Sequence, residues 1–164
     1  MRKPQPNALT TVKTGEIEFK DVSFHYPGRG FYVLRNFDMV MPAGQKIALV
    51  GHSGCGKSTI TSLILQFYNL KANCGKILID GTEISQYDVR ALRKQIGYVM
   101  QEPVLFNKTI KENIMYGKLD ATDEEVYIAA DKANCIDFIE GNALDGQGPL
   151  LFKAKLEDFV KFNS

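Results

Sequence analysis

The sequence predicts an α/β fold, and three observations carry this prediction. The chain has 164 residues, of which 45% are hydrophobic and 24% charged, as is typical of one soluble globular domain. Short apolar or alternating runs bounded by glycine, proline and aspartate predict strands at 15–24, 31–40, 45–50, 74–81 and 96–100. Segments with helical character predict helices at 58–69, 89–94, 109–116 and 123–134.

The chain opens with a polar segment, residues 1–14, which predicts a linker or arm. The strand at 15–24 alternates apolar and charged side chains, with a slip in the alternation near Asp21. Residues 26–30 (YPGRG) predict a turn or exposed loop. The strand at 74–81 closes with Asp80-Gly81, which favours a hairpin turn, and Thr122 or Asp123 is expected to cap the last helix.

Residues 51–58 (GHSGCGKS) have the glycine, lysine and serine spacing of a phosphate-binding P-loop. The run at 45–50 predicts a strand buried on both faces, and the helix at 58–69 follows the loop, which is the context that the motif requires. The glycines let the backbone wrap around a phosphate, and the N–H groups form an anion nest at the positive end of the helix dipole. Lys57 is expected to contact the β- and γ-phosphates, and the Ser58 hydroxyl to ligate Mg²⁺. The motif therefore predicts binding of ATP or a close relative.

Other reactive residues near the loop are expected to have structural roles. His52 is interpreted as a spacer and Cys55 as a small filler rather than a nucleophile. Hydrolysis needs an Asp at the end of an apolar strand and a Glu or Gln that orients water. The one similar run, residues 77–80 (ILID), is followed by Gly81, so Asp80 is interpreted as a turn residue.

Composition narrows the class of protein further. The net charge of +1 gives no electrostatic argument for nucleic acid, and no such partner is expected. Three cysteines without CxxC spacing argue against a disulfide framework or a zinc site. No run approaches the roughly 18 apolar residues of a membrane helix, and the N-terminus lacks the apolar run of a secretory signal. We expect a cytoplasmic location, or one at the cytoplasmic face of a membrane.

Several segments, in the right order, resemble the nucleotide-binding domain of ATP-binding cassette (ABC) transporters, in particular the multidrug-resistance or B-type exporters. They are the opening strand and aromatic loop at 17–28, the P-loop at 51–59, the hairpin at 75–85, the glutamine-loop segment at 89–117 and a helical segment at 125–139. The resemblance implies a P-loop NTPase core of the ABC ATPase type, with an antiparallel β subdomain and the start of a helical subdomain. It implies a partial domain at 15–140, with the P-loop at 51–59, the glutamine loop at 100–107 and the helical subdomain from 108 to 140.

The resemblance also implies roles for single residues. Tyr26 matches the aromatic residue that stacks on adenine, and Gln101 matches the glutamine that approaches Mg²⁺ beside Ser58. Glu102, Pro103 and Phe106 resemble the surface that contacts the membrane domain. The implied nucleotide-binding set is Tyr26, Gly51, Ser53, Gly54, Cys55, Gly56, Lys57, Ser58, Thr59 and Gln101. The implied ligands are ATP and Mg²⁺, and the implied partners are the transmembrane domain of an exporter and a second nucleotide-binding domain.

The family pattern is expected to stop near Ile139, so that the C-terminal part of the family fold is missing. The 164 residues contain no Leu-Ser-Gly-Gly-Gln signature, and we find no metal-linked Asp, catalytic Glu or switch His in the family's positions. No complete catalytic set is therefore expected, and hydrolysis by this chain alone stays uncertain. Residues 141–164 are interpreted as a divergent tail, with amphipathic helical spacing at 150–162. Two hypotheses remain: an ATP-binding domain that powers export in full-length form, or a non-catalytic regulatory fragment that pairs with an intact transporter domain.

Overall fold

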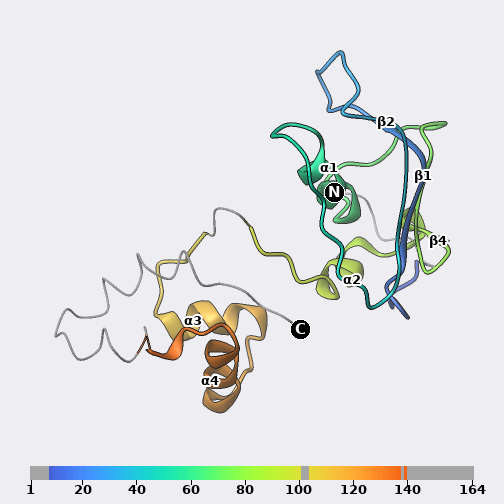
Figure 1. The fold of residues 1–164 in the computed structure, drawn as a ribbon. Coiled ribbons are helices and arrows are strands. Elements are labelled where there is room, and N and C mark those ends of the chain that lie inside the picture. The colour runs from blue at the N-terminus through green and yellow to red at the C-terminus, as the bar shows by residue number, and fades with distance from the viewer. Residues whose placement is uncertain (1–7, 101–103, 138, 140–164) are drawn as a thin grey trace. The chain divides into compact units, whose positions relative to one another are not determined.

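The structure is a computed structural model that describes residues 8–100, 104–137 and 139. The chain divides after Ile96 into two compact units, which are described separately below. The first unit holds the sheet and the P-loop, and the second holds a short helical bundle (Figure 1).

A four-stranded antiparallel sheet forms the framework of the first unit. Its strands are β1 (Ile17–Phe24), β2 (Leu34–Met41), β3 (Lys76–Ile79) and β4 (Thr82–Glu83), in the order β2-β1-β3-β4 (Figure 1). The register between β1 and β2 shifts between Phe19 and Val22, and Asp21 has a positive φ of 50°. The predicted slip near Asp21 is therefore a β-bulge, which confirms that part of the prediction.

The hairpin between β3 and β4 turns at Asp80 and Gly81, as predicted. Both residues have positive φ, 50° and 73°, which is the conformation of a type I′ turn. The Asp80 carboxylate also accepts the backbone N–H groups of Lys13, Thr14, Gly15 and Glu16 at 2.7–3.1 Å, and the Thr14 hydroxyl donates to it as well. Asp80 therefore anchors the end of the predicted arm onto the sheet.

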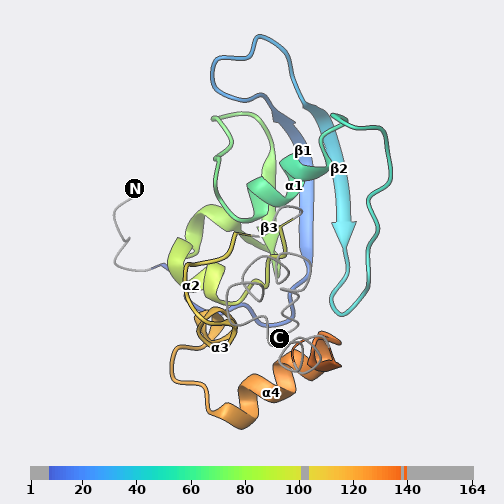
Figure 2. The same cartoon turned by 90° about the vertical axis from the view of Figure 1, so that its left-hand side faces the viewer.

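The hydrophobic core lies between the sheet and two helices, α1 (Lys57–Ile64) and α2 (Val89–Lys94). Figure 2 shows α1 in front of the strands. The largest fully buried side chains are Phe19 and Val22 of β1, Leu63 of α1 and Leu92 of α2. Asp88 caps α2, because its carboxylate accepts the N–H groups of Arg90 and Ala91. A short 3₁₀ helix, η1 (Ile84–Gln86), links β4 to this cap.

The helix after the P-loop is shorter than the predicted 58–69. It ends at Ile64, and Gln66 takes a positive φ of 50° while its side chain donates to the Ile84 carbonyl oxygen. The Arg93 guanidinium then donates to the carbonyl oxygens of Leu65 and Gln66 at 2.7 and 3.0 Å. These bonds satisfy carbonyl groups just beyond the last turn of α1, which explains the early end of the helix.

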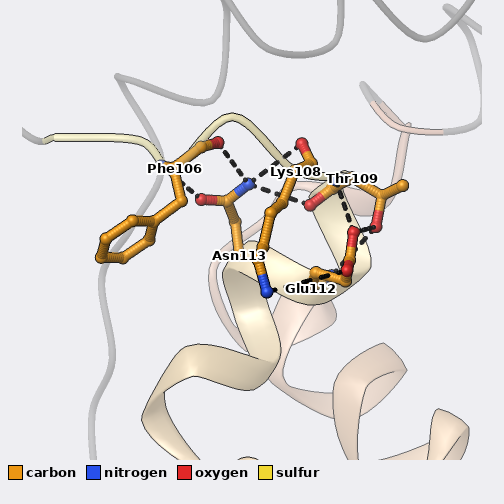
Figure 3. A network of polar contacts seen from close by, with 5 residues as sticks. All are labelled: Phe106, Lys108, Thr109, Glu112 and Asn113. Carbon is orange, nitrogen blue, oxygen red and sulfur yellow. Dashed lines mark hydrogen bonds and ion pairs between the residues drawn. The ribbon is translucent and has the colours of Figure 1, made fainter.

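The second unit contains α3 (Ile110–Ile114), the 3₁₀ helix η2 (Met115–Gly117) and α4 (Asp123–Lys132). Each α-helix begins with a capping box, Thr109 with Glu112 and Thr122 with Glu125, so the predicted cap at Thr122 is confirmed. Asn113 is buried beside the first box. Its side chain accepts the N–H of Phe106 and donates to the carbonyl oxygens of Phe106, Lys108 and Thr109 (Figure 3).

Two predicted strands do not form. Residues 45–50 and 96–100 have no strand conformation, and Val50 is 93% exposed where a buried strand was predicted. An extended segment becomes a strand only when its N–H and C=O groups pair with a neighbouring strand. Within the described residues, no strand pairs with either segment. The predictions of buried strands at 45–50 and 96–100 were therefore wrong.

The β2 strand begins at Leu34 rather than at residue 31, and β3 begins at Lys76 rather than at residue 74. Among the described residues, no helix has both the length and the hydropathy that a membrane crossing requires.

Candidate nucleotide-binding site

The P-loop forms the turn that enters α1. Gly56 occupies the N-cap with φ of 101°, a conformation that residues with a Cβ rarely adopt. A Cβ on Gly56 would also lie 3.2 Å from a methyl carbon of Leu34 and 3.3 Å from one of Val33. Gly54 likewise has a positive φ of 82°. At these two positions the predicted requirement for glycine has a direct structural cause.

Cys55 is exposed, and its Sγ lies next to Gly51. A Cβ on Gly51 would meet its Sγ at 2.7 Å, so the thiol fills the space that this glycine leaves open. The Cys55 N–H donates to the His52 carbonyl oxygen at 3.3 Å and closes the turn through Ser53 and Gly54. These contacts agree with a filler role for Cys55.

The Lys57 ammonium group folds back onto the loop. Nζ donates to the carbonyl oxygens of Gly51 and His52 at 2.7 and 2.8 Å and lies 3.4 Å from the Cys55 Sγ. The side chain is half-buried, whereas most of the loop is exposed. The loop therefore holds a positive charge at its centre, where an anion is attracted.

The N-terminus of α1 remains available to an anion, since no side chain within the described residues caps it. The first backbone N–H groups of an α-helix have no partner inside the helix, and they carry the positive end of its dipole. Ser58 is exposed in this first turn. The loop, the ammonium group and the uncapped helix thus fit a phosphate group, and the exposed Ser58 hydroxyl fits one ligand of Mg²⁺.

Tyr26 is tied to the P-loop through Thr59. The two hydroxyl oxygens are 2.9 Å apart, and Thr59 is only 2% exposed. Phe24 and Tyr68 contact the Tyr26 ring edge-to-face, with centroid distances of 5.1 and 4.9 Å. The structure therefore brings this predicted aromatic residue next to the predicted phosphate loop, although 33 positions separate Tyr26 from Thr59 in the chain.

The remaining predicted site residues follow Met100 in the sequence. Gln101, Glu102 and Pro103 lie outside the described residues. Phe106 is exposed and packs on Tyr116, with ring centroids 4.4 Å apart. Its backbone is fixed by the Asn113 side chain (Figure 3).

Sequence reasoning missed two residues beside Tyr26. Tyr68, in the loop after α1, packs on its ring, and the Arg29 guanidinium lies over the same ring at 5.6 Å. The Pro27-Gly28 pair was recognised as a turn signal, and a turn of that kind returns the chain towards its starting residue. That signal was sufficient to place Arg29 near Tyr26.

The sequence profile described as ABC transporter matches residues 34–148, which is more than half of the chain. The chain belongs to the ABC transporter family. This match includes the P-loop, α1, the hairpin, α3 and α4. Membership confirms the predicted ABC ATPase fold class with its antiparallel sheet.

Individual ABC transporters agree with this assignment. The uncharacterized ABC transporter ATP-binding protein YfiC of Bacillus subtilis is 49% identical over 140 residues, which are 85% of this chain and 23% of that protein. The mitochondrial iron-sulfur clusters transporter atm1 of Aspergillus fumigatus is 49% identical over 132 residues, which are 80% of this chain and 18% of that protein. The chain thus spans less than a quarter of the length of either relative.

A solved structure extends the likeness to three dimensions. The structure of a bacterial Atm1-family ABC exporter with ATP bound superimposes with a TM-score of 0.77 and 41% sequence identity. The match covers 83% of this chain and 24% of the exporter chain. The structural neighbour is an Atm1-family ABC exporter, and the chain resembles the nucleotide-binding part of such an exporter.

Proposed function

We propose that the chain binds MgATP through residues 51–59, as the nucleotide-binding part of an exporter that uses ATP to move a substrate across a membrane. The observation that carries the proposal is the position of Lys57. Its ammonium group lies within the loop on the carbonyl oxygens of Gly51 and His52, directly before the uncapped N-terminus of α1. A triphosphate offers the same ammonium group stronger, charged acceptors.

Magnesium binding is a further part of the proposal. Ser58 follows Lys57 in the first turn of α1 and is exposed, so that its hydroxyl group can serve as one metal ligand. Gln101 is proposed as the second protein contact, by its match to the family motif. When bound, Mg²⁺ would neutralise part of the negative charge of the phosphate groups.

In the full-length context, the proposed partners are the transmembrane domain of an exporter and a second nucleotide-binding domain, at the cytoplasmic face of the membrane. The exposed Phe106 and Tyr116 pair supports a contact surface in the second unit. Neither the described residues nor the related proteins offer support for the alternative of a regulatory fragment. We propose that this chain alone does not sustain hydrolysis, because its sequence has no catalytic Glu in the family's position.

Titration calorimetry of the purified chain with MgATP tests the proposal. Lys57→Ala should remove one or more hydrogen bonds to a charged group, worth about 1.5–3 kcal/mol, which corresponds to a roughly ten- to hundredfold higher Kd. Lys46→Ala is the matched control, since Lys46 is exposed just before the loop.

Two results would contradict this function. One is an absence of any nucleotide-dependent rise in melting temperature for the wild-type chain at millimolar MgATP. The other is an unchanged Kd in Lys57→Ala. Steady ATP turnover that disappears in Lys57→Ala would leave the binding site intact but overturn the proposal that the chain alone does not hydrolyse ATP.

A further inference from the structure

The loop after β1 returns on itself immediately beyond Tyr26. The Arg29 N–H donates to the Tyr26 carbonyl oxygen at 3.0 Å, and Gly28 has a positive φ of 79°. Proline at the second position and a left-handed glycine at the third are the signature of a type II turn. Because Pro27 fixes its own φ, this turn is largely preorganised by its sequence.

The turn places the Arg29 guanidinium over two aromatic rings. Its central carbon is 5.6 Å from the centroid of Tyr26 and 5.8 Å from that of Phe31. Arg29 and Phe31 are exposed, whereas Tyr26 is half-buried against the core. Arg29 is therefore the exposed neighbour of a ring that Phe24, Tyr68 and Thr59 hold in place.

From this arrangement we infer that Arg29 is a positioning residue for the nucleotide base, which it holds from the side opposite Tyr26. The inference rests on the proposed function. A base that stacks between the Tyr26 ring and the Arg29 guanidinium group requires these two groups to be two van der Waals distances apart, or roughly 7–8 Å. The present separation of 5.6 Å is too small, so Arg29 must move outward by about 2 Å when a base enters.

Such a movement exchanges one favourable contact for another. Guanidinium planes stack on nucleobases as well as on aromatic side chains, and Arg29 can therefore leave the Tyr26 ring for the outer face of the base. Without Arg29 that face would remain in water. The Tyr26 hydroxyl is bonded to Thr59, two residues beyond Lys57, so a base in this position would lie close to the phosphate loop.

The experiment compares MgATP with magnesium tripolyphosphate, which carries the phosphates without a base. Kd values are measured by titration calorimetry for the wild type, Arg29→Ala and Arg29→Lys. An exposed cation–π contact corresponds to about a two- to fivefold change in Kd, so Arg29→Ala should bind MgATP that much more weakly. Arg29→Lys should not restore the full wild-type affinity, because lysine has no planar group to stack on the base. Their affinity for tripolyphosphate should not change. Lysine keeps the positive charge but has no planar guanidinium group. Arg29→Lys therefore tests whether stacking on the base, rather than charge alone, supports MgATP binding.

Arg35→Ala is the matched control, because Arg35 lies over the Tyr32 ring at the same distance of 5.6 Å but outside the proposed site. It should bind MgATP like the wild type. An unchanged or higher MgATP affinity in Arg29→Ala overturns the inference, as does full affinity in Arg29→Lys or an equal loss for tripolyphosphate. Absence of MgATP binding by the wild type would instead refute the proposed function itself.

Discussion

The positively charged side chains of Lys57 and Arg29 make contacts within the protein that a bound nucleotide would replace. Lys57 donates to loop carbonyl groups, and Arg29 covers an aromatic ring. A bound triphosphate must therefore compete with existing hydrogen bonds, and its net gain is smaller than the strength of the new bonds alone. These internal contacts also keep the two charges ordered, which reduces the entropy that binding has to overcome.

The charge of Asp80 contributes to the stability of the first unit through the hydrogen bonds that its carboxylate accepts. Burial alone would raise the pKa of its carboxyl group, but hydrogen bonds from Thr14, Lys13 and Glu16 outweigh burial and lower the pKa from 3.8 to about 2. A lowered pKa stabilises the fold above the unfolded-state value, and this stabilisation is lost as the pH falls towards the folded-state value. The relevant window is therefore about pH 4 down to pH 2.

Asp80→Asn tests this carboxylate. The amide group has one acceptor oxygen in place of two and no charge, so the free energy of unfolding at pH 7 should fall by about 1–3 kcal/mol. The variant should also lose less stability between pH 4 and pH 2 than the wild type does. Urea denaturation across this range measures both effects. Asp131→Asn, at an exposed position in α4, is the control, and a pH profile of Asp80→Asn parallel to that of the wild type would contradict the prediction.

At the scale of elements, a single side chain organises the approach to α3. Asn113 is 8% exposed and bonds to three carbonyl oxygens and one N–H group of residues 106–109 (Figure 3). Together with the Thr109 and Glu112 capping box, it satisfies the backbone of the loop that carries the exposed Phe106. The position of the Phe106 side chain therefore depends on the hydrogen bonds between the Asn113 side chain and the backbone of this loop.

Asn113→Asp should weaken the structure of this loop, although the aspartate side chain has nearly the same size and shape as that of asparagine. The substitution places an acceptor oxygen against the three carbonyl oxygens, so each loses its donor. We expect the second unit to lose about 1–3 kcal/mol of stability. Hydrogen exchange at the Phe106 and Asn113 amides should speed up accordingly, since local opening becomes easier. Asn69→Asp makes the same change at an exposed site, and equal effects of the two substitutions would show that Asn113 has no special role.

The elements also show how far the sequence could predict the fold. The helix at 89–94 and the start at 123 agree with the prediction, because Asp88 and Thr122 act through backbone groups two or three residues away. The segments at 45–50 and 96–100 depend instead on a neighbouring strand, and strand composition does not supply that neighbour. The bond between Tyr26 and Thr59 was similarly beyond local patterns, since it joins the loop after β1 to α1; family resemblance, rather than periodicity, singled out Tyr26.

At the scale of the whole chain, the proposed metal site combines two residues that are 43 positions apart in the sequence, Ser58 and Gln101. Gln101 comes shortly before Phe106, in the segment that matches the family's glutamine loop. A shared Mg²⁺ contact would therefore link nucleotide binding to this segment, whose Phe106 is proposed to contact the membrane domain. This link can be tested by measuring how much Mg²⁺ strengthens the binding of ATP.

The measurement is the ratio of ATP affinity with Mg²⁺ to ATP affinity with a chelator. Ser58→Ala and Gln101→Ala should each reduce this ratio by roughly tenfold or more, the usual effect of removing a group that supports a metal. Gln86→Ala removes a glutamine side chain from an exposed site and should leave the ratio unchanged. A ratio that falls in Ser58→Ala but stays at the wild-type value in Gln101→Ala would remove Gln101 from the proposed metal ligands, and the proposed link between ATP and the membrane-facing surface would then need another contact.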